Sequence, residues 1–302
     1  MRECSRLVPL YLTRSWTLQS IAGAVVAAIF AVLVAPGTTK AQGQQYSVVA
    51  RVDAKSAGVV SRDIVVRVEN VSVPATAISA SPDIPRNIAI VVDSGPDQAN
   101  VLSKEKDLAN ALINELRNAK TSFTIASAGT SSKMQAATLD RSIAIAHILD
   151  ITGDSGAKTN IPIYDAIGSA IRQISATTGL RVVIFIGEGN DGGSGLRYAG
   201  LRSLAESNHV AVFAALIADH SLRGAKSFLR YGWNLMELTS DTAGIFLENQ
   251  KTPKATRRLG ESVGGLRLIS FEMPSRQPGR YKSSVSVRRG KRLRAQKAIV
   301  IP

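Results

Sequence analysis

Residues 87–93 read Asn-Ile-Ala-Ile-Val-Val-Asp, a continuous apolar run that ends in an aspartate. A run of this kind predicts a strand that is buried on both faces of a sheet. Residues 94–97 (Ser-Gly-Pro-Asp) form a turn signal, and residues 102–116 then place apolar side chains at helical spacing with charges between them. A buried strand that leads into an amphipathic helix indicates a unit of a parallel α/β sheet.

The same alternation of strand and helix patterns continues toward the C-terminus. Further strands are predicted at 122–127, 180–186, 210–217 and 244–247, and further helices at 139–151, 163–174, 196–206, 222–238 and 253–264. Strands that alternate with helices of this length favour a sheet covered on both faces. We therefore expect an α/β fold with a doubly wound, mostly parallel sheet over residues 86–264.

The segments on either side of this region read as small β segments. In 42–85, residues 46–52 and 63–69 predict strands, and Pro74, Pro82 and Pro85 predict a loop. In 265–302, strands are predicted at 267–271, 281–287 and 298–301. The two segments are able to pair with one another across the chain ends.

Residues 1–41 have the pattern of a signal peptide. Three arginines within the first 14 residues precede the apolar run 21–35, and Thr39-Lys40-Ala41 offers a small-x-small cleavage site. The apolar run is shorter than the roughly 20 residues that span a bilayer. We expect a secreted or periplasmic protein, which would be membrane-anchored if the segment were not cleaved.

The chain of 302 residues carries 37 Lys+Arg and 23 Asp+Glu, a formal charge of +14. Residues 253–302 hold 13 basic and 2 acidic residues, so the excess lies near the C-terminus. The basic run 288–294 is interpreted as a solvated face that protects an edge strand, or as a weak attraction to anionic surfaces. Export argues against a nucleic-acid partner. A single cysteine, Cys4, excludes a disulfide scaffold and a cysteine-based zinc site.

In an open α/β sheet, ligands bind at the carboxyl ends of the strands. The loops 93–97, 157–164 and 187–195 are expected there. Residues 187–192 (Gly-Glu-Gly-Asn-Asp-Gly) also spell a dinucleotide fingerprint. That motif belongs to the first βα unit, and Glu188 and Asp191 would face an anionic pyrophosphate. A flexible loop without a bound cofactor is the interpretation that we prefer.

Several of these segments together resemble the von Willebrand factor type A domain, in its secreted bacterial, acidobacterial-type branch. The resemblance rests on the apolar strand that ends in Asp93, on the helix start Ile161-Pro162-Ile163-Tyr164-Asp165-Ala166-Ile167, and on the loop after 180–186. Residues 238–244 (Leu-Thr-Ser-Asp-Thr-Ala-Gly) match a late segment of the family, and the tail from Leu266 to Arg294 is similar to the closing strands of that branch. The similarity covers roughly residues 86–300.

The resemblance implies a divalent cation at a metal-ion-dependent adhesion site, built from Asp-x-Ser-x-Ser, a threonine and a later aspartate. Here the first part reads Asp93-Ser94-Gly95-Pro96-Asp97, the threonine position falls on Ile161, and the later aspartate falls on Gly187. Asp93 alone keeps its residue type, so we expect that the site is degenerate. The alternative is a rebuilt Mg²⁺ or Ca²⁺ site with Asp93 and Asp97, joined by Glu188 or Asp191.

We therefore expect an exported, non-enzymatic interaction module that binds a protein partner in the cell envelope or outside the cell. The expected contact residues lie in the loops at the carboxyl edge: Asp93, Asp97, Ile161, Glu188, Asp191 and Ser194. The alternative is a hydrolase or nucleotide-using enzyme, for which Asp93 with His220 is the acid–base pair. A third hypothesis is a partner strand added to the terminal β segments. His209, before a buried strand, is expected to cap or pack, and Trp233 is expected to pack in a helix or loop.

Overall fold

The computed structural model describes residues 43–52, 59–80, 83–95, 101–116, 119–130, 132–154, 161–217, 225–288 and 293–301, and only the backbone of 225–231. They belong to one compact unit, Ala41–Pro302. The expected signal peptide, 1–41, lies outside the described residues. No helix within the described ranges is both long and apolar enough to cross a membrane.

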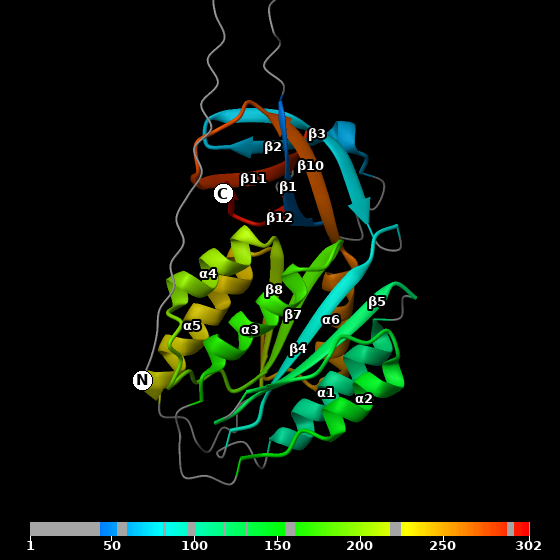
Figure 1. Ribbon diagram of the computed structural model, residues 1–302, viewed down its shortest axis with the longest axis vertical. Helices are drawn as coiled ribbons and strands as arrows, with labels where there is room; N and C mark the ends of the chain where they lie inside the picture. Colours follow the sequence, from blue (N-terminus) through cyan, green and yellow to red (C-terminus); the bar gives the residue numbers. More distant parts are fainter. Residues whose placement is uncertain are drawn as a thin grey trace, which may run out of the picture. The chain divides into compact units, whose positions relative to one another are not determined.

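A six-stranded sheet forms the centre of the region with alternating strands and helices (Figure 1). Its strands are β4 (Arg86–Asp93), β5 (Thr121–Ala128), β6 (Lys133–Met134), β7 (Leu180–Gly187), β8 (Val210–Leu216) and β9 (Phe246–Glu248). They lie in the order β6-β5-β4-β7-β8-β9, and all neighbours are parallel except β5 and β6. All eight residues of β4 are buried, which explains its continuous apolar run.

Helices cover both faces of this sheet. They are α1 (Leu102–Glu115), α2 (Arg141–Leu149), α3 (Ile163–Ser175), α4 (Tyr198–Ser207), α5 (Ala225–Asp241) and α6 (Thr252–Gly264). Alternate residues of β4 serve the two faces: Ile88 and Ile90 pack with α1, α2 and α6, and Ala89 and Val91 pack with α3, α4 and α5. The predicted doubly wound α/β fold is confirmed by this strand order and by the two helix layers.

The chain ends form a second, antiparallel sheet. Its strands are β1 (Gln44–Arg51), β2 (Ile64–Val68), β3 (Val71–Ala80), β10 (Leu266–Met273), β11 (Gly279–Val287), β12 (Arg294–Ala295) and β13 (Ala298–Ile301), with the short 3-10 helix η2 (Ser61–Asp63) before β2. The order is β12-β1-β10-β3-β2-β11-β13. Val48 near one edge and Ile301 near the other belong to the same core, so the sheet curls around its own apolar interior.

The loop predicted around Pro74 is wrong, because Pro74 lies within β3. Pro74 pairs with Val65 of β2, whereas the pairing of β3 with β10 ends at Ala75 next to a register shift. The proline therefore sits where β10 no longer needs a backbone N–H from β3, the kind of place in a sheet that tolerates proline. Pro82 lies outside the described residues.

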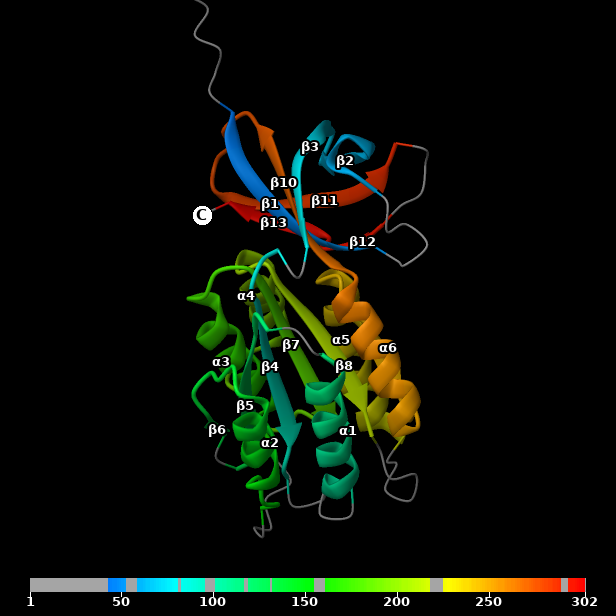
Figure 2. The same cartoon turned by 90° about the vertical axis from the view of Figure 1, so that its right-hand side faces the viewer.

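The two sheets share apolar packing, because β10 begins directly after α6 (Figure 2). In β1, Val49 belongs to the core beneath α1 and α6, while its neighbour Val48 belongs to the core of the seven-stranded sheet. Leu266 and Ile269 of β10 divide in the same way. One face of each of these strands therefore packs on the helical layer and the other face closes the second sheet.

Candidate functional site

The carboxyl ends of β4 and β7 form the switch point of the six-stranded sheet. From β4 the chain passes through α1 to β5 on one side, and β7 lies on the other side of β4. The connections therefore diverge at this edge, where ligands bind in open α/β sheets. Figure 2 shows the edge at the end of the sheet that points away from the seven-stranded sheet.

Asp93 is the last residue of β4, and its side chain is fully buried at this edge. Its Oδ1 accepts a hydrogen bond from the backbone N–H of Gly95 at 3.1 Å. The following residue, Ser94, bonds through its backbone N–H and its hydroxyl to the carbonyl of Ala128 on β5, at 2.8 and 3.3 Å. Asp93 and Ser94 thus fix the turn that leaves β4.

Ile161 packs directly over this turn. A Cβ added at Gly95 would lie 1.8 Å from Cδ1 of Ile161, so the isoleucine side chain fills the space that a side chain at 95 would need. Ile161 is only 4% exposed, and its carbonyl accepts the backbone N–H of Gly192 at 3.1 Å. An apolar group therefore caps the turn at the end of β4.

Gly187, at the end of β7, is equally restricted by Asp93. A Cβ at this position would lie 2.3 Å from Cβ and 3.0 Å from Oδ2 of Asp93. No real Cβ tolerates such contacts with a neighbouring carbon. An aspartate at 187 could not share this edge with Asp93 in its present position.

Glu105, on the first turn of α1, brings a further carboxyl group to the site. Its side chain is fully buried, and among the described residues neither carboxyl oxygen has a hydrogen-bond partner. Burial first, and then the negative charges of Asp93 and Glu188, raise the pKa of Glu105 well above its ordinary value of 4.5. The geometry thus favours a protonated carboxyl group beneath the edge.

Asp191 and Ser194 brace the loop after β7 against the start of α3. Asp191 Oδ1 accepts the backbone N–H of Tyr164 at 3.1 Å and the hydroxyl of Ser194. In return, Asp165 accepts the N–H groups of Gly195 and Leu196, both at 2.8 Å. Burial raises the pKa of Asp191, and these hydrogen bonds oppose the rise. Oδ1 of Asp191 and both carboxylate oxygens of Asp165 are thus engaged within the fold.

The structure brings five of the six predicted contact residues to this edge. Asp93 and Ile161 lie at the turn after β4, while Asp191 and Ser194 belong to the brace on α3. Glu188 is half-buried directly after β7 and acts electrostatically on Glu105. Asp97 and His220 lie outside the described residues. Sequence reasoning missed Glu105 and Asp165. The described part of the chain contains no group of three or more His, Cys, Asp or Glu residues arranged to hold a metal ion.

The glycine-rich motif 187–192 does not open a helix. Gly189 adopts a positive φ of 79°, and α4 begins only at Tyr198, after the brace. Within the motif, the carboxylate of Asp191 accepts a hydrogen bond from the N-terminus of α3. In a dinucleotide-binding motif, the helix N-terminus that follows the glycines binds the phosphate instead. The local structure is that of a braced loop.

Two further sequence expectations concern single aromatic residues. His209 lies in the turn between α4 and β8 with a positive φ of 51°, and burial lowers its pKa. The burial of His209 agrees with the expectation that this side chain packs against the fold. Trp233 lies on a helix, α5, and its side chain is 58% exposed.

Comparisons with known proteins give likeness of structure alone. No protein-family model and no curated protein matches the sequence. An aerotolerance-related membrane protein from Bacteroides fragilis, with multiple mutations to serines, is 17% identical at a TM-score of 0.48, covering 59% of this chain and 98% of its own. A von Willebrand factor type A protein from Catenulispora acidiphila is 9% identical at a TM-score of 0.48, and the match covers 87% of this chain and 74% of that protein. A pilus adhesin from Lactobacillus rhamnosus GG, in an open conformation, is 8% identical at a TM-score of 0.47, and the match covers 78% of this chain and 47% of the adhesin. The fold assigned above rests on the strand order and the helix layers themselves.

Proposed function

We propose that this chain is an exported, non-enzymatic protein-interaction module of the von Willebrand factor type A kind. In this proposal it binds a partner protein of the cell envelope or the exterior through the loops at the carboxyl edge of the six-stranded sheet. The observation that carries the proposal is the packing of Ile161 over Gly95 beside Asp93. It closes the switch point with a hydrocarbon surface and leaves the surrounding loops as the available contact surface.

We further propose that this contact does not depend on a metal ion. Three of the positions at which the family places oxygen ligands carry Gly95, Ile161 and Gly187, none of which has a side-chain oxygen. The space at both glycines is already taken by neighbouring side chains. Hard cations need several converging oxygens, and the donors described at this edge do not supply them. A partner would then be recognised by shape and charge.

The loop after β7 is suited to this role because it is held in place before a partner arrives. The brace between Asp191, Ser194 and Asp165 ties it to α3, while Asn190 and Gly193 within it are exposed. A loop that is already ordered loses little conformational entropy on binding. The described residues give no observation that favours the hydrolase or nucleotide-using alternative.

Site-specific crosslinking tests this proposal. A photo-crosslinking amino acid at Asn190, on the loop, should capture one defined protein in the cells that produce the chain. The same group at Lys282, exposed on β11 of the seven-stranded sheet at the opposite end from this edge (Figure 2), is the matched control and should not capture that protein. Addition of EDTA should leave the crosslink unchanged. Equal capture from both positions would refute the contact surface, and loss of the crosslink in EDTA would refute its independence of metal.

A further inference from the structure

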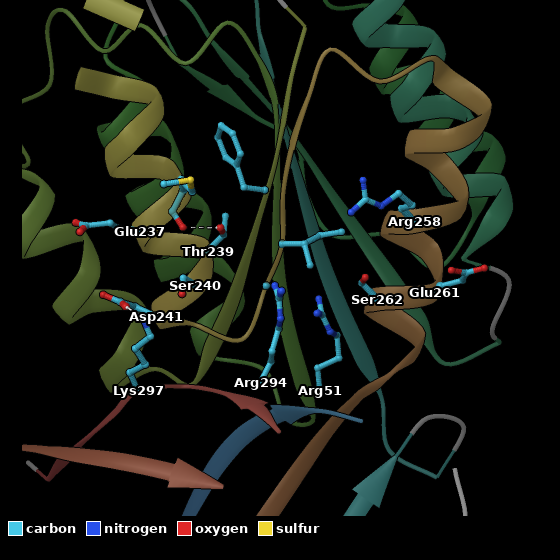
Figure 3. A pocket seen from close by; sticks show the side chains of 14 residues that line it. Arg51, Glu237, Thr239, Ser240, Asp241, Arg258, Glu261, Ser262, Arg294 and Lys297 are labelled. Atoms are coloured by element: carbon cyan, nitrogen blue, oxygen red, sulfur yellow. Dashed lines mark hydrogen bonds and ion pairs between the residues drawn. The ribbon is translucent and has the colours of Figure 1, made fainter. Parts of the chain in front are cut away.

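A pocket lies at the opposite, amino-terminal edge of the six-stranded sheet, where the sheet meets the seven-stranded one (Figure 3). Its volume is about 550 Å³. The C-terminal halves of α5 and α6 and the start of β9 line it from one side, and the ends of β1 and β12 line it from the other. Because both sheets contribute side chains, a ligand in this pocket would contact both at once.

Three arginines from three different elements point into the pocket. Arg51 on β1 and Arg294 on β12 are direct partners in the antiparallel pairing of these strands, so their side chains leave the same face. Arg258 enters from α6 (Figure 3). Like charges directly opposite each other on paired strands repel, and an anion placed between them removes that repulsion.

The described acidic side chains of the lining do not pair with Arg258 or Arg294. Asp241 is already engaged by Lys297 at 2.9 Å and by Arg202 at 3.5 Å. Glu237 and Glu261 are exposed and point away from the centre of the pocket in Figure 3. None of these described carboxylates therefore forms an ion pair with Arg258 or Arg294.

The guanidinium groups of Arg258 and Arg294 are exposed and form no hydrogen bond or ion pair with any other described residue. Their donors are available to a ligand, in a planar arrangement that fits anionic oxygens. Met236, Ile245 and Phe246 supply an apolar part of the lining. The pocket thus offers cationic donors together with a hydrocarbon surface.

We propose that this pocket binds a small phosphate monoester whose phosphate is paired with Arg51, Arg258 and Arg294, and whose apolar body lies against the hydrocarbon part of the lining. One arginine fork can satisfy both oxygens of a carboxylate, whereas the three terminal oxygens of a phosphate match three guanidinium groups. The site is independent of the carboxyl edge, so it stands or falls separately from the partner contact proposed above.

Isothermal titration of the purified protein with phenyl phosphate and with inorganic phosphate, at low ionic strength, tests the site. Both should bind, and phenyl phosphate should bind more tightly because its ring uses the apolar lining. Arg258→Ala and Arg294→Ala should each weaken binding by about tenfold or more, since each removes a charge-assisted hydrogen bond. Arg258→Lys should also weaken it, because lysine lacks the fork.

The matched control is Arg257→Ala, which removes the same charge from an exposed neighbour outside the pocket lining. Its affinity should stay within about twofold of that of the parent protein. Equal weakening by Arg257→Ala and Arg258→Ala would overturn the proposal, because net charge would then explain the binding. Absence of binding to both soluble phosphates and to phosphatidic acid vesicles would also overturn it. Binding to the vesicles alone, abolished by Arg294→Ala, would keep the phosphate site and assign the phosphate to a lipid headgroup.

Discussion

At the scale of single residues, Glu105 ties the stability of the fold to pH. Its pKa in the folded protein is raised by burial and by the charges of Asp93 and Glu188, while in the unfolded chain it returns to its ordinary range near 4.5. Between these two values the folded state holds a proton that the unfolded state has released. The free energy of unfolding contributed by this group therefore falls as pH rises from about 4.5 toward the raised pKa.

Glu105→Gln should remove this dependence. Glutamine keeps the shape and cannot ionise, so the variant should be more stable than the parent at pH 8 by about 1–3 kcal/mol and differ little from it at pH 4.5. Urea unfolding at a series of pH values measures both effects. Glu115→Gln, an exposed carboxyl on the same helix, is the control. Parallel pH profiles for the parent and the Glu105 variant would contradict the argument.

At the scale of elements, the buried strands could be predicted because a strand covered on both faces must be apolar throughout. The two-residue strands β6 and β12 could not, because so short a segment has no period of its own. β3 was hidden by Pro74, whose tolerance depends on where β10 stops pairing. That information lies in the partner strand and not in the local sequence.

The candidate site shows the same limit. Asp93 could be placed at the edge because it ends an apolar run. Glu105 looked like one of the solvated charges of its helix, yet its spacing to Leu102 and Leu108 puts it on the apolar face, and that signal could have revealed it. The brace formed by Asp165 could not be predicted, because it depends on contact with a distant loop.

Removal of a hydrogen bond from this brace should lower the stability of the protein. Asp191→Ala removes the acceptor for the Tyr164 N–H at the start of α3, and should lower the free energy of unfolding by about 1–2 kcal/mol. Asp191→Asn retains one acceptor oxygen and should lose less. Amide hydrogen exchange at Tyr164 should accelerate in the alanine variant. Unchanged exchange there would show that the helix start is held by other contacts.

At the scale of the whole described unit, a buried carboxylate on α4 links this helix to the seven-stranded sheet. Arg280 of β11 forms two hydrogen bonds, of 2.6 and 2.7 Å, to Glu206 of α4, whose side chain is fully buried. Gln296 donates to the backbone carbonyl of the same glutamate at 2.6 Å. The pKa of Arg280 is raised, chiefly by its hydrogen bonds to Glu206. At least one positive charge of the C-terminal segment, that of Arg280, therefore stabilises the fold through an ion pair.

Arg280→Ala should lower the free energy of unfolding by about 2 kcal/mol, because it leaves the Glu206 carboxylate buried without this partner. Arg280→Lys should fall between the parent and the alanine variant, since lysine restores the charge and not the paired geometry. Lys282→Ala, an exposed residue of the same strand, removes an equal charge and should change stability little. Urea unfolding compares the three variants. Equal losses for Arg280→Ala and Lys282→Ala would show that this link contributes nothing specific.

The pairing of β1 has a consequence for how the protein folds during synthesis. Both neighbours of β1, β10 and β12, come much later in the sequence, with residues 52–265 between β1 and β10. A nascent polypeptide on the ribosome therefore carries β1 without its neighbouring strands until β10 and β12 have been synthesised, in a form that can pair with other chains. Because the pairing of β1 with β10 and β12 is so distant in sequence, we expect the seven-stranded sheet to form slowly, and β1 to need chaperone protection until then.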